Sequence, residues 1–198
     1  MAEQPLDPQP LEALRQAIAS GDPARAMPAI AALREVPPEQ AVPLLLLGLQ
    51  QETFMIRSLS CAGLGYKQSE PGWDALVAAL LHDDDPNVRA EAANALVSHS
   101  VERAWPLLRD AFVANEHWLV RCSILSAMAE LIDVPLPWLL ELARLAIADG
   151  DGTVRVGGAE ILGRLVAEGS AEARAELVPL QADSDHRVVA AALNGLQG

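Results

Sequence analysis

Apolar residues recur along this chain at helical spacing. In six segments an apolar side chain lies seven residues after an anchor position, and seven residues make two helical turns, so the two positions share one side of a helix. The anchors are Ala26, Arg57, Arg89, Arg121, Arg155 and Val189, and their partners are Leu33, Leu64, Leu96, Met128, Leu162 and Leu196. The pattern predicts six related helices.

Polar residues mark where these helices begin. Four residues before each anchor stand Asp22, Thr53, Asp85, His117, Asp151 and Asp185. Five of the six are of the types preferred at helix N-caps, where they contribute about 1 kcal/mol relative to alanine. Pro23 and Pro86 follow two of them, at the first helical position, where the missing N–H costs nothing.

A second set of apolar segments lies upstream of each of these helices. It predicts partner helices over 10–19, 39–50, 71–81, 102–114, 136–148 and 171–181. Three of them carry a tryptophan that opens an apolar stripe: Trp73, Trp105 and Trp138. We interpret these stripes as core between neighbouring units. A ladder of rings that stacks on a ligand is the alternative.

The helices therefore form pairs, with an A helix and a B helix in each repeat. A repeat of this size cannot bury its apolar face alone, so we expect one domain over residues 10–198, preceded by a flexible, proline-rich stretch over 1–9. The expected repeats span about 10–36, 37–69, 70–100, 101–134, 135–169 and 170–198. The predicted fold class is all-α.

The composition supports a helical fold, and the charge excludes some classes of binding partner. Apolar residues make up 51% of the chain but aromatic residues only 4%, unlike the composition of β-sheets. The net charge of −13 argues against nucleic acid and anionic membranes, and it suits a partner with a basic patch or serves solubility alone. No apolar run is long enough to span a membrane. The opening residues lack a secretory pattern, so we expect a cytoplasmic protein.

The repeated core resembles the HEAT repeat of phycobilisome-lyase-like proteins. Residues 85–96 contain it as DPNVRAEAANAL, and Leu64-Gly65 and Leu162-Gly163 supply the trailing glycine of the motif. The likeness covers residues 10–198 and is strongest in repeats two to five, whereas the last repeat has Val188-Val189 where the motif has Val-Arg. The resemblance implies a right-handed α-solenoid of about six helix pairs, with the B helices on the concave side.

The segment HWLVRCSIL, residues 117–125, is also similar to cyanobacterial stand-alone HEAT proteins. Members of that group attach bilins to phycobiliproteins, promote phycobilisome breakdown, or accompany iron–sulfur scaffold proteins. The resemblance implies that the arginines pair with carboxylates or helix-end carbonyls of neighbouring repeats. The alternative is a row of cations that faces a carboxylate ligand such as a bilin propionate. The row consists of Arg57, Arg89, Arg121 and Arg155.

Candidate partner-binding residues follow from the same register. Positions two and five after an anchor should face the groove, and Trp118 offers an aromatic side chain of the kind enriched at interface hot spots, unless it packs against a loop. Glycine occupies one such position, Gly157. The candidates on the concave face are Asn87, Glu91, Asn94, His117, Trp118, Cys122, Ser123, Ser126 and Glu160.

Motifs for catalysis are missing from the sequence. Cys61 falls at a core position and Cys122 at a half-exposed one, and two thiols cannot complete a four-cysteine cluster site. The histidines lack metal-binding spacing, and no phosphate-binding or nucleophile-elbow motif occurs.

These observations predict a non-catalytic scaffold, adaptor or chaperone in phycobilisome or photosynthetic protein assembly or turnover. We expect a monomer without cofactor or metal whose partner is another protein, such as a phycobiliprotein. A bilin lyase or isomerase, or a subunit of one, is the first alternative and would bind bilin. A protein associated with an iron–sulfur scaffold, and thus with a cluster, is the second.

Overall fold

The computed structural model describes residues 5–114, 117–131 and 133–197, and over these ranges the chain is helical and contains no strand. The A helices are α1 (Pro8–Ala19), α3 (Pro38–Gly48), α5 (Glu70–His82), α7 (Val101–Ala114), α9 (Leu136–Ile147) and α11 (Ala171–Leu177). The B helices are α2 (Pro23–Ala32), α4 (Phe54–Tyr66), α6 (Pro86–His99), α8 (Trp118–Ala129), α10 (Gly152–Ala167) and α12 (His186–Gln197). The all-α solenoid of six helix pairs is confirmed. The first four residues of the expected flexible stretch lie outside the described residues.

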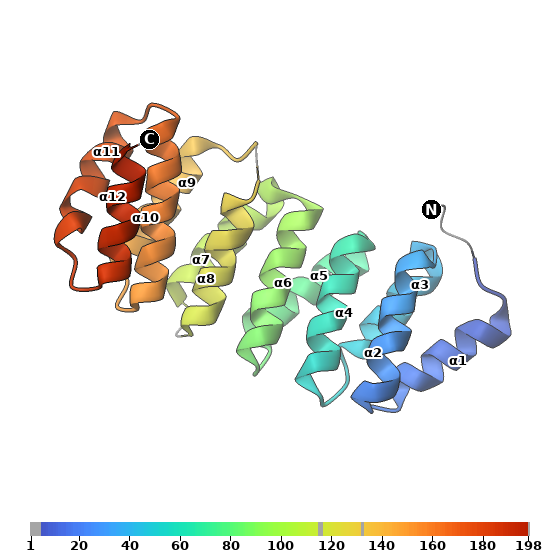
Figure 1. Cartoon of the computed structure of the whole chain (residues 1–198). Helices are drawn as coiled ribbons and strands as arrows, with labels where there is room; N and C mark the ends of the chain where they lie inside the picture. The colour runs from blue at the N-terminus through green and yellow to red at the C-terminus, as the bar shows by residue number, and fades with distance from the viewer. Residues whose placement is uncertain (1–4, 115–116, 132, 198) are drawn as a thin grey trace. The chain divides into compact units, whose positions relative to one another are not determined.

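The chain divides into two compact units, Met1–Leu107 and Leu108–Gly198. In the first unit, α2, α4 and α6 lie side by side in one layer and α1, α3 and α5 form the layer behind them (Figure 1). In the second unit, α8, α10 and α12 form the corresponding layer, and α9 and α11 pack against it (Figure 1). Each unit therefore has a layer of B helices.

In five of the six B helices, the residue that precedes the anchor belongs to the core. Ile56, Val88, Val120, Val154 and Val188 are completely buried. Each such side chain contributes about 1.5–3 kcal/mol when it leaves water. The four arginine anchors are half-buried at the edge of this core, where they can keep their charged ends near the loops, whereas the first anchor, Ala26, is completely buried.

The N-cap residues are those that the sequence predicted, but Thr53 makes no side-chain cap hydrogen bond and His117 does. Asp22, Asp85 and Asp151 accept hydrogen bonds from the backbone N–H two residues ahead, at 2.7–3.0 Å. Thr53 occupies the N-cap of α4 but accepts no backbone N–H there, and its hydroxyl donates to the carbonyl of Gly21 at 3.4 Å. His117, the one residue of an unfavourable type, does cap, through Nδ1.

The last A helix is shorter than the predicted span of 171–181. Helix α11 ends at Leu177, and the chain continues as the 3-10 helix η2 (Val178–Ala182). Pro179 lies in this turn and has no N–H for an α-helical hydrogen bond. A similar 3-10 turn, η1 (Leu33–Glu35), follows α2.

Candidate protein-binding face

The arginines of the B helices connect consecutive repeats. Arg57 of α4 forms a bidentate ion pair, here called a fork, with Asp83 in the turn between α5 and α6. The Nε–Oδ2 and Nη2–Oδ1 distances are 2.8 and 2.9 Å. Its remaining nitrogen, Nη1, donates to the carbonyls of Gln51 and Glu52 in the turn of its own repeat. One guanidinium thus holds two successive turns together.

The same arrangement recurs further along the chain. Arg121 forks onto Asp149, with distances of 2.6 and 3.0 Å, and Arg155 onto Asp183, with both distances 2.9 Å. Arg89 donates Nη1 to the carbonyls of Asp83 and Asp84. The carboxylate-facing edge of three guanidinium groups is therefore occupied by aspartates of this chain. We propose on this geometry that the row is structural.

Each aspartate of the fork also holds the start of the next B helix. The N–H groups of Asp85, Asp151 and Asp185 donate to Asp83, Asp149 and Asp183, respectively, at 2.7–2.9 Å. For Asp183, the hydrogen bonds from Arg155 are the main cause of a lowered pKa, and the backbone N–H of Asp185 adds to it. The Asp183 carboxylate is thus held in its charged form.

The other ends of the B helices are joined by a set of contacts that the sequence analysis missed. Lys67, the only lysine, is buried and donates to the carbonyl of Arg34 at 2.8 Å. His99 Nε2 lies 2.8 Å from the carbonyl of Leu64, and Arg164 donates to that of Ala129 at 2.7 Å. The sequence feature that could have revealed these contacts is a basic residue nine or ten positions after an arginine anchor.

A cleft of about 400 Å³ lies between α8 and α10, and we call it the α8–α10 cleft. It brings together three of the predicted binding residues: Cys122, Ser126 and Glu160. The sequence analysis did not single out Glu130 or Arg164, which also line it. The rest of the lining consists of Leu125, Ala129, Thr153, Val156, Gly157 and Ile161.

The charge of the α8–α10 cleft is negative. Glu130 and Glu160 are both exposed to solvent. Arg164 is already engaged, by Glu168 at 3.0 Å and by helix-end carbonyls. Burial raises the pKa of the half-buried Cys122 thiol, and the charge of Asp151 adds to the shift. The cleft thus offers carboxylates and a protonated thiol.

A smaller cleft of about 180 Å³ lies between α4 and α6. Glu91 and Asn94, two more of the predicted residues, line it together with Tyr66 and Ser98. Burial raises the pKa of Glu91, and a hydrogen bond with Asn94 opposes this shift. Both clefts lie between adjacent B helices, and four of the predicted residues that stand two or five positions after an anchor line them: Glu91, Asn94, Ser126 and Glu160.

Comparison with known proteins identifies the family. The HEAT-repeat family matches residues 48–129 and 73–146, which together cover half of the chain. The chain belongs to the HEAT-repeat family. No curated protein matches this HEAT-repeat protein.

Two solved structures are similar to this HEAT-repeat protein. The complex of CpcE and CpcF of phycocyanin lyase from Nostoc sp. PCC7120 is 22% identical, with a TM-score of 0.43 over 97% of this chain and 100% of that chain. Human deoxyhypusine hydroxylase in complex with glycerol is 16% identical, with a TM-score of 0.43 over 96% of each chain.

The remaining predicted binding residues of this HEAT-repeat protein lie outside the two clefts. The Asn87 side chain donates to the capping carboxylate of Asp85, and Ser123 is half-buried on α8. The rings of His117 and Trp118 stack at the start of α8, 6.0 Å apart, and Trp118 is 43% exposed. Asn87, Glu91 and Asn94 belong to the first compact unit, and the other candidates to the second.

The tryptophans and cysteines show which candidates belong to the core. Trp73 and Trp105 are buried, whereas Trp138 is only half-buried. Cys61 is completely buried, and burial raises the pKa of its thiol to about 12.

Among the described residues no group of three or more His, Cys, Asp or Glu side chains is placed to hold a metal ion. No helix in the described ranges is long and apolar enough to cross a membrane.

Proposed function

We propose that this HEAT-repeat protein is a non-catalytic adaptor or chaperone that binds a basic segment of another protein on its B-helix layer. The α8–α10 cleft carries the proposal, because it presents Glu130 and Glu160 beside an arginine that is already engaged. A lysine or arginine of the partner would form charge-assisted hydrogen bonds with these carboxylates.

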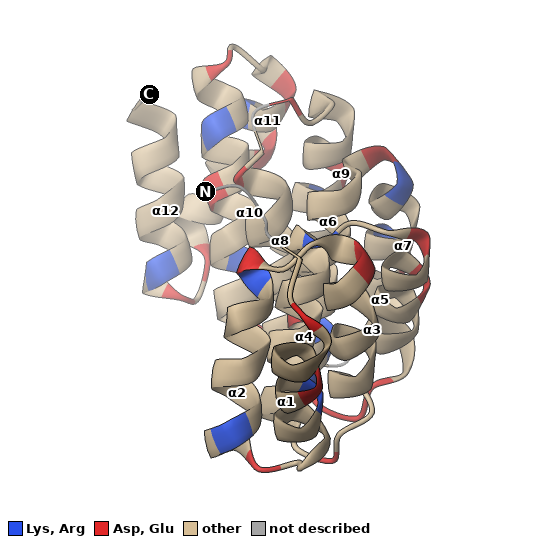
Figure 2. Ribbon diagram, turned by 90° about the vertical axis from the view of Figure 1, so that its right-hand side faces the viewer, with Lys and Arg blue, Asp and Glu red and all other residues tan. Residues whose placement is uncertain are grey.

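The charge of the whole protein supports the same kind of partner. The net charge is −13, and acidic segments lie mainly at helix ends and in turns (Figure 2). A field of one sign speeds the encounter with a partner of the opposite sign. The Cys122 thiol favours binding over covalent chemistry, because the thiolate is the nucleophile and burial keeps this group protonated.

The resemblance of the repeated core suggests where the partner belongs. The core resembles that of phycobilisome-lyase-like HEAT proteins, so phycobiliprotein subunits and other proteins of photosynthetic assembly or turnover are the first partners to test. In this proposal the protein acts as a monomer in the cytoplasm and needs no cofactor.

The proposal is tested by exchanging charge in the cleft. The double variant Glu130→Gln/Glu160→Gln removes two carboxylates, and Glu12→Gln/Glu39→Gln removes the same charge from α1 and α3 as a matched control. We expect the first variant to bind its partner at least about tenfold more weakly and the control to bind as the wild type does. Pull-downs from cyanobacterial extract identify the partner, and titration calorimetry with the purified partner gives the affinity. Equal losses in both variants would show that only net charge matters.

Two experimental results would contradict a purely binding role. If the purified protein, mixed with bilin and an apo-phycobiliprotein subunit, produced a covalent red-shifted adduct, it would be a lyase. If anaerobically purified protein carried iron and sulfide that were lost in Cys122→Ser, it would be an iron–sulfur accessory protein. We expect neither result.

A further inference from the structure

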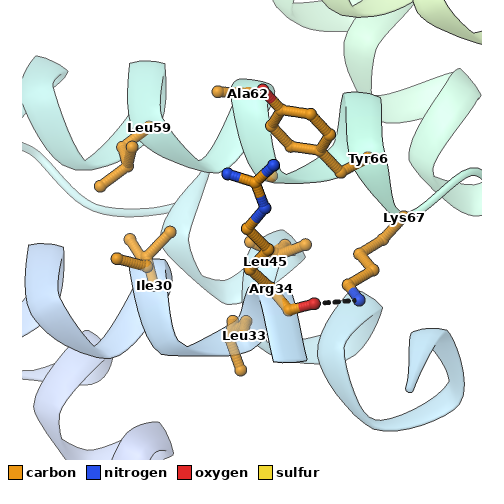
Figure 3. Close-up of a pocket in the computed structure, with 10 residues that line it drawn as sticks. Ile30, Leu33, Arg34, Leu45, Leu59, Ala62, Tyr66 and Lys67 are labelled. Carbon is orange, nitrogen blue, oxygen red and sulfur yellow. Dashed lines mark hydrogen bonds between the residues drawn. The ribbon is translucent and has the colours of Figure 1, made fainter. Parts of the chain in front are cut away.

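A second cleft, in the first compact unit, differs in character from the α8–α10 cleft. This α2–α4 cleft has a volume of about 180 Å³ and lies between α4 and the segment formed by α2 and η1 (Figure 3). Most of its lining is apolar, and Leu45 of α3 contributes from the layer behind. The lining residues are Ile30, Ala31, Leu33, Arg34, Leu45, Leu59, Ala62, Gly63, Tyr66 and Lys67.

The cleft lies where α2 ends and η1 begins. Pro28 lies within α2, and the helix ends at Ala32 after ten residues, whereas α4 runs for thirteen. At Gly63, a Cβ atom would meet the end of the Leu45 side chain. The missing side chain lets Leu45 line the cleft. Tyr66, in the last turn of α4, is left 68% exposed.

A cation stands beside this apolar cleft. The guanidinium carbon of Arg34 lies 4.9 Å from the centroid of the Tyr66 ring (Figure 3). No carboxylate among the described residues pairs with Arg34, although acidic residues outnumber basic ones by 27 to 14 in the chain. The backbone carbonyl of Arg34 is fixed in turn, because it accepts a hydrogen bond from the Lys67 ammonium at 2.8 Å.

We propose that the α2–α4 cleft is a docking site for a peptide segment of a partner protein in which one bulky apolar side chain stands next to an aspartate or glutamate. A cavity of about 150 Å³ accepts benzene, so this cleft can accept a leucine or phenylalanine side chain. The neighbouring carboxylate would then meet the Arg34 guanidinium, which forks readily onto a carboxylate.

This site is independent of the function proposed for the α8–α10 cleft. The two clefts lie in different compact units and are lined by different helices. Their charges are opposite, so one binds basic and the other acidic segments. Failure of either proposal therefore leaves the other unaffected.

The probes are end-capped hexapeptides in a Gly-Ser frame with a central Leu-Asp pair. Titration into ¹⁵N-labelled full-length protein should shift the backbone amides of Ala31, Gly63 and Lys67 in two-dimensional NMR spectra. Replacement of the leucine by alanine should weaken binding at least about tenfold, because the cleft then stays empty. Replacement of the aspartate by asparagine should weaken binding about threefold, because one exposed charge pair is lost.

Three variants of the protein separate the two parts of the site. Ala31→Leu fills the cleft from an exposed position and should abolish binding. Arg34→Gln should bind the Asp and Asn peptides equally, since the charge preference comes from this residue. Arg25→Gln makes the same charge change on α2 outside the cleft and should bind as the wild type does. Ala31, Arg34 and Arg25 are exposed, so thermal unfolding should show that all three variants fold.

Other outcomes would overturn the proposal. Equal affinity for Asp, Asn and Lys peptides would remove the role of Arg34, and shifts that persist in Ala31→Leu would place the peptide elsewhere. Binding of octanoate without binding of any peptide would make the cleft a site for small amphiphiles. Shifts of the same amides that depend on protein concentration, without peptide, would show that a second copy occupies it.

Discussion

Two rows of arginines join consecutive repeats, one on the B helices and one on the A helices. In the B-helix row, Arg57, Arg121 and Arg155 and their aspartates are only 11–16% exposed. In the A-helix row, the arginine side chains are 44–48% exposed and their glutamates 25–74%. This row pairs Arg103 with Glu70, Arg109 with Glu141, and Arg144 with Glu172 and Glu176.

The difference lies in what else each pair holds. The aspartates of the B-helix row also accept the N–H group of the next N-cap residue, and the arginines bind turn carbonyls. An exposed pair competes with water and loses side-chain entropy, so it contributes little. The geometry of two rows can therefore look alike while their contributions to stability differ greatly.

The largest expected effect comes from Asp149→Ala. It leaves the Arg121 guanidinium largely buried and without its fork, and it also removes the acceptor for the Asp151 N–H. We expect a loss of about 2–3 kcal/mol in the free energy of unfolding, measured in urea. Glu141→Ala, in the same unit, is the matched control and should lower the thermal midpoint by less than about 2 °C. Similar losses in the two variants would remove the distinction between the rows.

The second effect is on pH dependence. The pKa of Asp183 is lowered in the folded protein, so its contribution is present above its unfolded pKa of about 3.9 and is lost as pH falls through the folded pKa. Wild type should therefore be more stable than Asp183→Asn at neutral pH, and the two should converge in acid. The hydrogen bond from Arg103 also lowers the pKa of Glu70, so Glu70→Gln should show the same trend with a smaller amplitude. Thermal midpoints from pH 7 to 2.5 measure both.

Arg103 should be the strongest member of the A-helix row. Its guanidinium lies 4.1 Å from the centroid of the Trp73 ring in addition to binding Glu70. We expect Arg103→Ala to lower the thermal midpoint about twice as much as Arg109→Ala, because it also loses the contact with the ring. Tryptophan emission should move to longer wavelength as water reaches Trp73. An unchanged spectrum would show that the arginine does not shield the ring.

The smallest effect is expected from Arg144→Gln. In low salt it should lower the thermal midpoint by less than about 2 °C, and in 1 M NaCl the difference should vanish, because the Debye length falls to about 3 Å. The loss caused by Asp149→Ala should remain largely intact in the same salt. A salt-resistant loss in Arg144→Gln would mean that the exposed row contributes more than screening allows.

The start of each B helix could be predicted from the sequence because a cap is a local interaction. Asp22, Asp85 and Asp151 bind N–H groups two residues away, within reach of any sequence argument. Thr53 does occupy the predicted N-cap position, but its side chain makes no cap hydrogen bond and its hydroxyl contacts Gly21, 32 residues away. Such a contact depends on how repeats pack and leaves no trace in the local pattern.

The clefts were only partly predictable. Ser126 and Glu160 each stand five residues after an anchor, so helical periodicity places them at equivalent positions of neighbouring helices, and both line the α8–α10 cleft. The sequence analysis missed Arg34, Lys67 and Arg164. Lys67 and Arg164 bind carbonyls at or just after the end of the preceding B helix, and Arg34 lies just after the end of α2, so their roles depend on where these helices end. The division of the chain into six repeats with the stated bounds stays a prediction.

The forks have a consequence for how such arrays are lengthened and shortened. Arg121 and Arg155 each find their aspartate 28 residues ahead, and 34 residues separate the two arginines. Deletion of residues 122–155 would join Arg121 to Val156 and bring it to the same separation from Asp183. A deletion or insertion of the span from one arginine to the next therefore keeps each arginine 28 residues before an aspartate. Recombination at these positions would preserve the ion pair between consecutive repeats.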